Sequence, residues 1–176
     1  IVDTYPNIEN INSIEIVNMK ENRGHARCIA SGLKYIFEKK EFDFVIPMDG
    51  DGEDRPEEIK NFIEFSEKSG GKSLVGDRVK RSEGLIFKTC YQFHKFLTLA
   101  FTGQSIKFGN FTCLSKSTVK ILIDEKATWN SFSGSLKKIE KDLISIPSTR
   151  GKRYFGPSQM SFFNLLKHSL SIISVF

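Results

Sequence analysis

The feature that most constrains the fold is a β-rich run, Phe42–Met48, that ends abruptly in the sequence Asp-Gly-Asp-Gly-Glu-Asp at residues 49–54. A short run rich in aromatic and β-branched residues, bounded by a glycine-containing turn, is typical of a buried strand. The sequence therefore predicts a strand whose carboxyl end carries an acidic turn.

Extended runs alternate with segments whose apolar residues recur at helical spacing along the rest of the chain. Strands are predicted at Ile14–Asn18, Phe42–Met48, Ser73–Gly76, Ile106–Leu114 and Leu143–Ile146, and helices over Cys28–Phe37, from Pro56 onward, over Leu85–Phe101 and over Ser117–Ile123. Such alternation predicts an α/β fold with a mainly parallel sheet flanked by helices. Ligands of these sheets bind beyond the carboxyl ends of the strands, which is where the acidic turn lies.

Length and composition indicate one folded domain. With 176 residues, 39% hydrophobic and 27% charged, the chain can bury a core and is neither collagen-like nor disordered. The cysteines Cys28, Cys90 and Cys113 lack the spacing of a zinc site or a disulfide framework. We therefore expect three reduced, buried thiols in a cytosolic environment.

The net charge of +5 is concentrated in the stretch Lys137–Lys167, which holds seven basic and two acidic residues. A basic stretch can bind nucleic acid or an anionic membrane surface. This one has neither the aromatic pattern of an RNA-binding sheet nor a recognisable reading helix, so no nucleic-acid partner is expected.

The carboxylates of the acidic turn are candidate metal ligands, because crowded carboxylates repel one another unless a cation neutralises them. Hard oxygen ligands suit Mg²⁺, Mn²⁺ or Ca²⁺. A calcium-binding EF-hand loop is excluded, since it needs glycine at its sixth position and glutamate at its twelfth, where this chain has Asp54 and Lys60. The alternative is a solvated turn in which Asp54 caps the helix that Pro56 begins.

Four segments in this order resemble motifs of the family-2 glycosyltransferases, in particular the polyprenyl-phosphate sugar transferases similar to dolichol-phosphate mannose synthase. The segments are Asn22–Gly32, similar to N-x-G-H-x-x-A-I-x-x-G; Asp49–Glu57, similar to D-x-D-x-Q-D-P-P-E; Val75–Arg81, similar to G-x-R; and Arg153–Gln159, similar to R-x-x-G-x-S-K. The resemblance implies a GT-A-type, Rossmann-like fold. The nucleobase-gripping first strands of that fold have no counterpart here, and the chain begins at Ile1, so we expect a fragment of a longer protein.

The resemblance also implies ligands for a divalent cation, Mg²⁺ or Mn²⁺, bound to the diphosphate of a nucleotide-sugar. Asp51 is the expected first metal ligand, Asp49 its neighbour on metal or ribose, and Glu53, where the family often has Gln, a third ligand. The phosphate- and donor-binding residues implied in the same way are Asp49, Gly24, His25, Arg78, Arg81, Arg153 and Ser158. For each arginine taken alone, a solvated surface charge is the alternative, and for His25 it is a role in the geometry of the helix start.

Two positions depart from the family pattern. Gln159 replaces a usual lysine, and Gly109-Asn110-Phe111 stands where the family often has Gly-Asp-Phe, whose aspartate is proposed as the catalytic base. An amide cannot accept a proton as a base, so Asn110 is expected to position the acceptor or to mark a changed acceptor. A phosphate-monoester acceptor needs little deprotonation near neutral pH, because its second pKa is about 6. The expected catalytic set is Asp51, Arg153 and Asn110, acting in a direct, inverting displacement.

The chain is therefore expected to divide into a partial catalytic domain, residues 1–157, and an amphipathic membrane-proximal helix, residues 158–176. The final stretch is rich in Phe, Leu, Ile and Val but shorter and more polar than a span of about 20 apolar residues. An interfacial helix would place the upstream basic residues near anionic headgroups at the cytoplasmic face of a membrane. The alternative is an ordinary buried helix.

The predicted function is metal-dependent transfer of a sugar from a nucleotide-sugar donor to a polyprenyl-phosphate or related lipid-linked acceptor at a membrane surface. The enzymatic alternative is a nucleotide-sugar pyrophosphorylase, whose glycine-rich nucleotide loop is not seen in this sequence. The non-enzymatic alternative is a membrane-surface binding module with an inert acidic turn.

Overall fold

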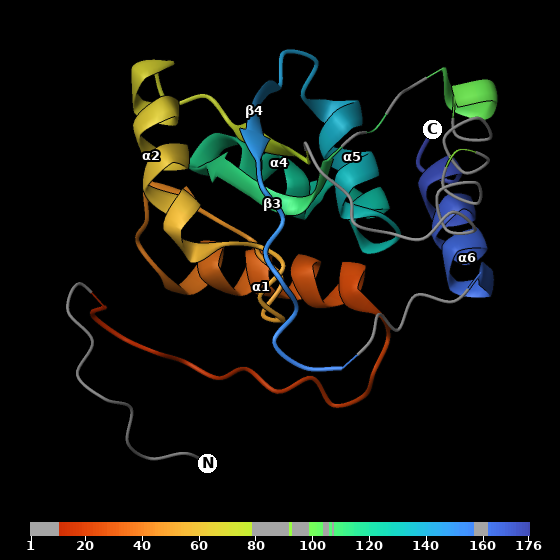
Figure 1. Ribbon diagram of the computed structural model, residues 1–176, viewed down its shortest axis with the longest axis horizontal. Coiled ribbons are helices and arrows are strands. Elements are labelled where there is room, and N and C mark those ends of the chain that lie inside the picture. Colours follow the sequence, from red (N-terminus) through yellow and green to blue (C-terminus); the bar gives the residue numbers. More distant parts are fainter. Residues whose placement is uncertain (1–10, 79–91, 93–98, 104–105, 107, 157–161) are drawn as a thin grey trace.

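A computed structural model describes residues 11–78, 92, 99–103, 106, 108–156 and 162–176. Figure 1 shows a small sheet with helices packed around it and α6 at one side. The elements are α1 (His25–Lys39), β1 (Phe44–Val45), η1 (Pro56–Glu58), α2 (Ile59–Lys68), β2 (Leu74–Arg78), β3 (Phe108–Ser115), α4 (Lys116–Asp124), η2 (Lys126–Trp129), α5 (Phe132–Ile139), β4 (Ile144–Ser148) and α6 (Phe162–Ile173).

Four strands form one sheet in the order β1-β3-β2-β4. β3 runs antiparallel to both of its neighbours, whereas β2 and β4 are parallel. β1, β2 and β4 therefore share one direction, and β3 is the reversed strand between them. This helix-flanked α/β sheet confirms the predicted fold class and is consistent with a GT-A-type fold. The prediction of mainly parallel pairing is wrong for the described strands, because the reversed β3 makes two of the three strand pairs antiparallel. Because β3 is reversed, its first residues lie beside the carboxyl end of β2, and the chain that leaves β1 runs towards them from the other end of β3.

Two hydrophobic cores cover the two faces of the sheet, because successive side chains of a strand point to opposite faces. Against α2, the core contains Phe62, Leu74, Phe111, Cys113 and Ile146. On the other face, with α1, α4 and α5, it contains Leu33, Val75, Leu114, Val119, Leu122, Phe132 and Leu136. Burying each such aliphatic or aromatic side chain contributes about 1.5–3 kcal/mol relative to leaving it exposed. The two cores fix the ends of β1, β2 and β3, where the acidic turn and Asn110 lie.

Helix starts follow the sequence signals. Pro56 opens η1, where a missing N–H costs nothing. The Ser115 hydroxyl accepts a hydrogen bond from the Thr118 N–H at the start of α4, and Ser131 caps α5 in the same way. α5 was not predicted, because its Ser- and Gly-containing sequence has a low helix propensity; burial of Phe132 and Leu136 in the core outweighs that propensity.

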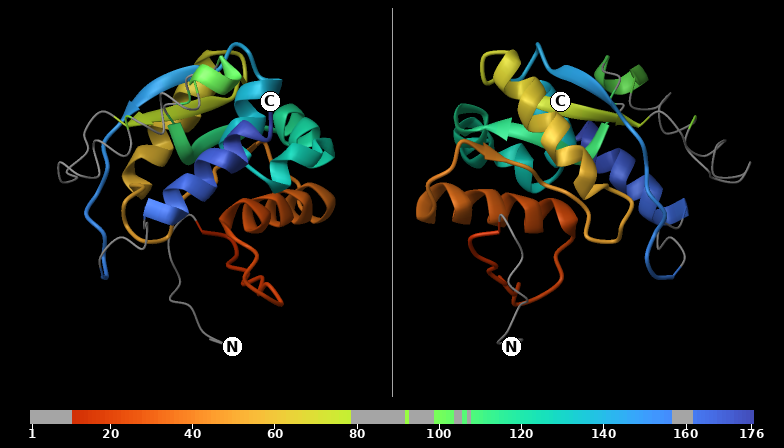
Figure 2. Two further views of the ribbon diagram at one scale, coloured as in Figure 1. Left: turned by 90° about the vertical axis from the view of Figure 1, so that its right-hand side faces the viewer. Right: turned by 60° about the vertical axis from the view of Figure 1, so that its left-hand side comes forward.

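Residues 14–18 are not a strand, contrary to the prediction. This segment is exposed and runs beneath α1, on the side of the helix away from the sheet (Figures 1 and 2). It is tied to α1 by Glu15, which accepts hydrogen bonds from Lys40 and from the Tyr35 hydroxyl. These contacts, that from Lys40 first, lower the pKa of Glu15. An extended segment without a neighbouring strand has no partner for its backbone N–H and C=O groups and so forms no ladder.

The predicted strand Phe42–Met48 is present only as β1, two residues long and half-buried at the edge of the sheet. The neighbouring strand β3 is longer. Phe44 and Ile46 of the predicted strand still pack against the core on the α2 face of the sheet. Most of the predicted helix Leu85–Phe101 lies outside the described residues. Its described end is helical from residue 99 to 102.

α6 confirms that the C-terminal stretch contains a helix, and it packs against α5. Ile172 and the following Val175 are buried, whereas Leu170 and Phe176 are about half exposed. Within the described ranges, no helix combines the length and apolar character that crossing a bilayer requires.

The described cysteines differ in exposure, so the prediction of uniformly buried thiols is wrong for Cys28, whose helix face is uncovered. Cys113 is fully buried, and burial raises the pKa of its thiol to about 11. Because the thiolate is the reactive form, iodoacetamide at pH 8 is expected to modify Cys28 in the native protein and Cys113 only after unfolding. Mass spectrometry of labelled peptides measures both, and labelling of native Cys113 at the rate of Cys28 would contradict the buried position.

Burial of the Cys113 thiol also predicts a pH dependence of stability. The folded-state pKa lies above the ordinary value of 9.0, so the contribution is present below pH 9 and is lost as pH rises towards 11. Urea unfolding from pH 8 to 11 measures the loss, and a Cys113→Val variant is expected to lose less stability over that range.

Candidate active site

The acidic turn after β1 is held by its own carboxylates. The Asp54 side chain accepts a hydrogen bond from the Asp49 N–H at 2.8 Å, and Asp51 Oδ1 accepts one from the Glu53 N–H at 3.0 Å. Asp54 is buried and closes the turn, and the N-cap residue of η1 is Arg55, which makes no side-chain capping hydrogen bond. The alternative in which Asp54 caps the following helix is therefore not observed. These hydrogen bonds hold the turn as a preorganised loop.

A second segment, residues 149–156 after β4, lies directly against this turn, and we call it the strap. The Gly151 N–H donates to the Glu53 carbonyl at 2.9 Å, and the Tyr154 N–H donates to the Asp51 carbonyl at 2.8 Å. Gly52, with φ +91°, lies under the Tyr154 ring, where a Cβ atom would come within 2.7 Å of ring carbons. A Cβ atom on Gly151 would collide with the Gly52 carbonyl oxygen. Gly52 is therefore required by its positive φ and by the Tyr154 ring, and Gly151 is required by the close backbone contact.

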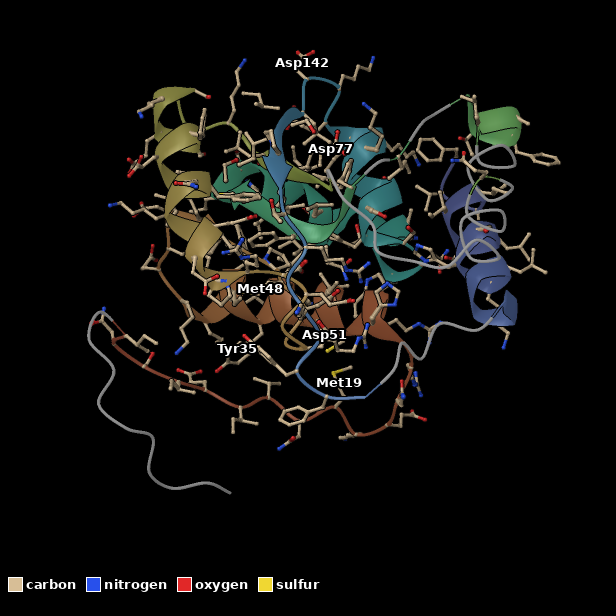
Figure 3. The ribbon with its side chains drawn as sticks, viewed as in Figure 1. Met19, Tyr35, Met48, Asp51, Asp77 and Asp142 are labelled. Carbon is tan, nitrogen blue, oxygen red and sulfur yellow. The ribbon has the colours of Figure 1, made fainter. Side chains whose placement is uncertain are left out.

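The strap is also anchored at its start by Glu58, at the end of η1. The Glu58 carboxylate accepts hydrogen bonds from the Ser148 hydroxyl at 2.7 Å and from the Thr149 N–H at 2.9 Å. The acidic turn and the strap, about 100 residues apart in sequence, are thereby fixed as one unit. In Figure 3, Asp51 lies beside the chain that follows β4, whereas Asp142 lies at the opposite end of β4.

Two arginines of the strap form ion pairs with two of the four carboxylates of the acidic turn. Arg153 Nη2 lies 3.1 Å from Asp51 Oδ2 and 2.9 Å from Glu53 Oε2, and Arg150 also pairs with Glu53. The four side chains in these ion pairs, two arginines and two carboxylates, are between 16% and 32% exposed. Water therefore screens the ion pairs only partly. Two carboxylate oxygens from different residues thus converge on a single cationic atom.

Asn110 joins the same site from β3. Its Nδ2 donates a hydrogen bond to Asp49 Oδ1 at 3.1 Å. The register explains the contact: Phe44 pairs with Ser115 and Val45 with Leu114, and the same antiparallel register continued along the chain brings Asp49 opposite Asn110. The reversed strand therefore delivers an amide to the first carboxylate of the turn.

A cleft of about 990 Å³ opens beside Arg153. Its wall is formed by the start of α1, the end of η2, the strap and α6, and its lining residues are Asn22, Arg23, Gly24, His25, Ala26, Arg27, Trp129, Asn130, Arg153, Lys167, His168, Ser171 and Ser174. The lining carries four Arg and Lys side chains and no carboxylate. Positive charge and the backbone N–H groups at the start of α1 suit this cleft to an anionic ligand.

His25 and His168 both line this cleft, and their rings lie in a tilted arrangement with centroids 5.7 Å apart. A second cleft of about 630 Å³ adjoins it and shares Arg23, Arg27 and Trp129. Trp129, 40% exposed, is therefore an aromatic surface between two basic clefts.

The structure brings most of the predicted site residues into two adjoining groups. Asp51, Glu53 and Arg153 meet at the turn, where Asp49 holds Asn110, and Gly24 and His25 line the cleft that Arg153 borders. Arg78 ends β2, but its side chain, like the whole of Arg81 and Ser158, lies outside the described residues. Among the residues that are described, no group of three or more His, Cys, Asp or Glu side chains is arranged to hold a metal ion.

Sequence reasoning missed Arg150, Glu58, Arg27 and Trp129. The sequence Arg-Gly-Lys-Arg at 150–153 contains Arg150, but nothing in it distinguishes this residue from an ordinary exposed arginine. The ion pair with Glu53 makes that distinction, and it is known only from the structure. Glu58 looked like a helix-start acid, and the strap contact that defines it spans 90 residues. Trp129 carries no motif, so no local signal pointed to it.

Comparison with known proteins agrees with this geometry. The model of the family described as "Glycosyl transferase family 2" matches residues 1–122. Three curated relatives carry the name undecaprenyl-phosphate 4-deoxy-4-formamido-L-arabinose transferase. They are those of Photorhabdus laumondii (25% identical over 167 residues, 88% of this chain and 47% of that protein), Proteus mirabilis (27% over 172, 91% and 48%) and Klebsiella pneumoniae (23% over 163, 90% and 47%).

The chain spans about half the length of these curated relatives. No solved structure matches it. The family match covers more than two thirds of the chain and includes the acidic turn, α1 and Asn110. On this evidence the chain belongs to glycosyl transferase family 2.

Proposed function

We propose that this chain is part of a metal-dependent glycosyltransferase that moves a sugar from a nucleotide-sugar donor to polyprenyl phosphate or a related lipid-linked acceptor. The observation that carries the proposal is the cluster of Asp51, Glu53 and Arg153, because its arginine also borders the basic cleft. Carboxylates for a cation and guanidinium for a phosphate thus lie side by side, as the diphosphate of a nucleotide-sugar requires.

The donor chemistry of the turn supports a divalent cation, although the described residues contain no ready-made site of three or more ligands. Asp51 Oδ2 and Glu53 Oε2 already converge on one positively charged nitrogen, and hard oxygen ligands are what Mg²⁺ and Mn²⁺ prefer. Asp51 and Glu53, with Asp49 beside them, are the residues that would hold the ion. When bound, Mg²⁺ or Mn²⁺ supplies Lewis-acid stabilisation of the charge on the departing nucleoside diphosphate.

Arg153 has two possible partners, the carboxylates of the turn and an anion in the cleft. When the turn binds a cation, we expect Arg153 to exchange its carboxylate partners for a donor phosphate, which its planar guanidinium can bind with two hydrogen bonds. Gly24 and His25, at the start of α1, line the same cleft and provide further phosphate contacts. Arg78, Arg81 and Ser158 remain proposed contacts of the donor. The reaction we propose is a direct displacement at the anomeric carbon with inversion.

The names of the relatives support polyprenyl phosphate as the acceptor class. Exposed apolar side chains near the cleft support a membrane-facing surface. Tyr154 and Phe155 of the strap are 64% and 90% exposed, and Leu170 projects from α6. Lys152 of the strap and Lys167 of α6 are exposed as well, and exposed apolar and cationic side chains together favour binding to anionic membranes. We propose that this surface lies on the cytoplasmic face of a membrane and that residues 158–176 form its interfacial helix.

Family membership favours the transferase over the nucleotide-sugar pyrophosphorylase considered as an alternative. The binding module with an inert acidic turn is the remaining alternative and is an outcome of the test.

The test uses the full reading frame that encodes this chain, expressed in membranes. A panel of UDP- and GDP-sugars is offered with polyprenyl phosphate, in Mn²⁺ or in EDTA, and lipid-linked sugar is measured. We expect transfer from one class of donor in Mn²⁺ and none in EDTA. Transfer that is unaffected by EDTA contradicts metal dependence. Metal-independent binding to anionic liposomes, without transfer from any donor, favours the binding module.

A further inference from the structure

Trp129 lines both basic clefts but has no part in the function proposed above. It is the only tryptophan of the chain, it is 40% exposed, and it shares both linings with Arg23 and Arg27. An isolated exposed aromatic side chain is common on protein surfaces. A tryptophan between two clefts is a different case, because a ligand that extends from one cleft into the other has to lie against it.

The indole is carried by a backbone that is fixed on both sides of it. The Thr128 hydroxyl donates a hydrogen bond to the Leu122 carbonyl at 2.8 Å, and the Asn130 N–H donates one to the Ala127 carbonyl at 2.9 Å. Thr128 is buried, and η2, which Trp129 ends, packs against α1 and α5. A rigid aromatic side chain on such a support loses little conformational entropy when a ligand covers it.

The two clefts offer different chemistry on the two sides of this indole. The larger one holds Arg153 and the start of α1, to which the donor diphosphate is assigned above. The smaller one adds residues that the larger lacks, namely Asn18, Met19, Lys20 and Glu21. The amide and carboxylate oxygens among them can accept hydrogen bonds from hydroxyl groups. Glu21 is oriented by Arg23, whose Nε donates to Glu21 Oε1 at 2.7 Å.

We propose that the sugar of the nucleotide-sugar donor stacks on the indole of Trp129 and directs its hydroxyl groups into the smaller cleft, an inference that rests on the proposed function. A pyranose has a face of C–H groups and a rim of hydroxyls, which match the apolar indole face and the polar groups around it. The sugar is bonded directly to the diphosphate, whereas ribose separates the nucleobase from it. The sugar is therefore the ring that lies nearest to the phosphate-binding groups, and Trp129 contributes to the choice of sugar.

Two other parts of the substrates could cover an indole. The prenyl chain of the acceptor suits this place less well, because an apolar chain would cover charged groups of the smaller cleft, those of Lys20, Glu21, Arg23 and Arg27. The nucleobase is planar and can stack on tryptophan as a sugar does. These two occupants predict different results from those expected for the sugar.

The decisive measurement compares the affinities of two ligands for the full-length protein by calorimetry in Mn²⁺. One is the UDP- or GDP-sugar that gives transfer in the panel above, and the other is UDP or GDP alone. Trp129→Ala is expected to weaken binding of the nucleotide-sugar roughly tenfold to a hundredfold, because both the stacking contact and the covered apolar area are lost. Binding of the nucleoside diphosphate should change less than about threefold, since its charge-assisted phosphate contacts remain.

Equal weakening of both ligands overturns the proposal, because it assigns Trp129 to the nucleobase or to the general shape of the cleft. Unchanged donor affinity with a raised KM for polyprenyl phosphate overturns it as well, in favour of the prenyl chain. If no UDP- or GDP-sugar gives transfer, the proposed function fails and this inference fails with it. Transfer by the wild type with either of the first two results sinks this inference alone.

Further variants separate stacking from a loss of structure. Trp129→Phe keeps an aromatic face and should recover most of the affinity for the nucleotide-sugar, whereas Trp129→Leu keeps only apolar bulk and should recover less. Phe65→Ala is the matched control, since Phe65 is a 50% exposed aromatic residue of α2 that is not among the described lining of either cleft. Its two affinities are expected to equal those of the wild type. Full recovery by Trp129→Leu would contradict stacking.

Nuclear magnetic resonance gives a readout that does not depend on affinity. In the complex with wild-type protein, the indole ring current should move the sugar protons upfield and leave the base protons in place. The shift should be absent in Trp129→Ala at saturating ligand. An upfield shift of the base protons instead of the sugar protons contradicts the proposal.

Discussion

Replacing Asp51 by asparagine is expected to lower kcat for sugar transfer by roughly a hundredfold to ten-thousandfold, because a lost Lewis-acid contact costs several kcal/mol in the transition state. Asp51 Oδ2 is one of the two carboxylate oxygens that converge on the cation position now held by Arg153. An amide oxygen carries no net charge and binds Mg²⁺ or Mn²⁺ much more weakly. The assay is metal-dependent transfer in membranes, with the donor found for the wild type.

The same substitution should leave the turn folded. Asparagine keeps an oxygen at Oδ1, which can still accept the hydrogen bond from the Glu53 N–H. Arg153 keeps its contact with Glu53. Asp142→Asn is the matched control, since Asp142 is exposed at the opposite end of β4 (Figure 3) and should retain full activity. Wild-type activity in Asp51→Asn would contradict the proposed metal site, whereas a loss of activity in both variants would point to a general effect of lost negative charge.

Replacing Gly151 by alanine is expected to destabilise the protein by about 1–3 kcal/mol, the usual cost of an overpacked contact. The added methyl group would collide with the Gly52 carbonyl oxygen, and neither partner is a flexible side chain that could move aside. Relief of the collision has to separate the strap from the acidic turn. Transfer should then fall roughly a hundredfold, because Arg150 and Arg153 would be misplaced by an ångström or so.

Gly32→Ala is the control for this substitution. Gly32 lies within α1, and nothing stands within 4 Å of the position its Cβ atom would take. That variant should gain about 0.5–1 kcal/mol, because alanine loses less backbone entropy than glycine in a helix. Urea unfolding followed by circular dichroism measures both. Equal stability of Gly151→Ala and wild type would contradict the close backbone contact between strap and turn.

Much of the fold was predictable because its signals are local. The apolar spacing of α1, the proline that opens η1 and the acidic turn after β1 can each be identified within about ten residues. Elements that depend on distant partners were harder to predict. The exposed segment 14–18 has strand-like composition but no neighbouring strand, and α5 forms because Phe132 and Leu136 are buried by other elements.

In the candidate site, too, local features could be predicted and contacts between distant segments could not. Asp49, Asp51 and Glu53 are adjacent in sequence, so their proximity was expected. Asn110 could be selected by its motif, but its hydrogen bond to Asp49 depends on the reversal of β3, which a mainly parallel sheet does not imply. Arg150 and Glu58 were missed because nothing in the sequence around either residue indicates which chain segment it contacts.

The contacts between the acidic turn and the strap also affect the order in which the protein folds during synthesis. Glu53 and Arg153 are 100 residues apart, and closing so long a loop costs entropy that only later contacts recover. Pairing at such sequence separation is slow relative to local helix formation. During synthesis the carboxylates of the turn leave the ribosome long before their arginines, so a nascent chain carries an uncompensated acidic loop until β4 and the strap have emerged. The ion-paired cluster of turn and strap is therefore expected to be among the last parts of this region to assemble, and a chain interrupted after β4 is expected to fold much of its core without it.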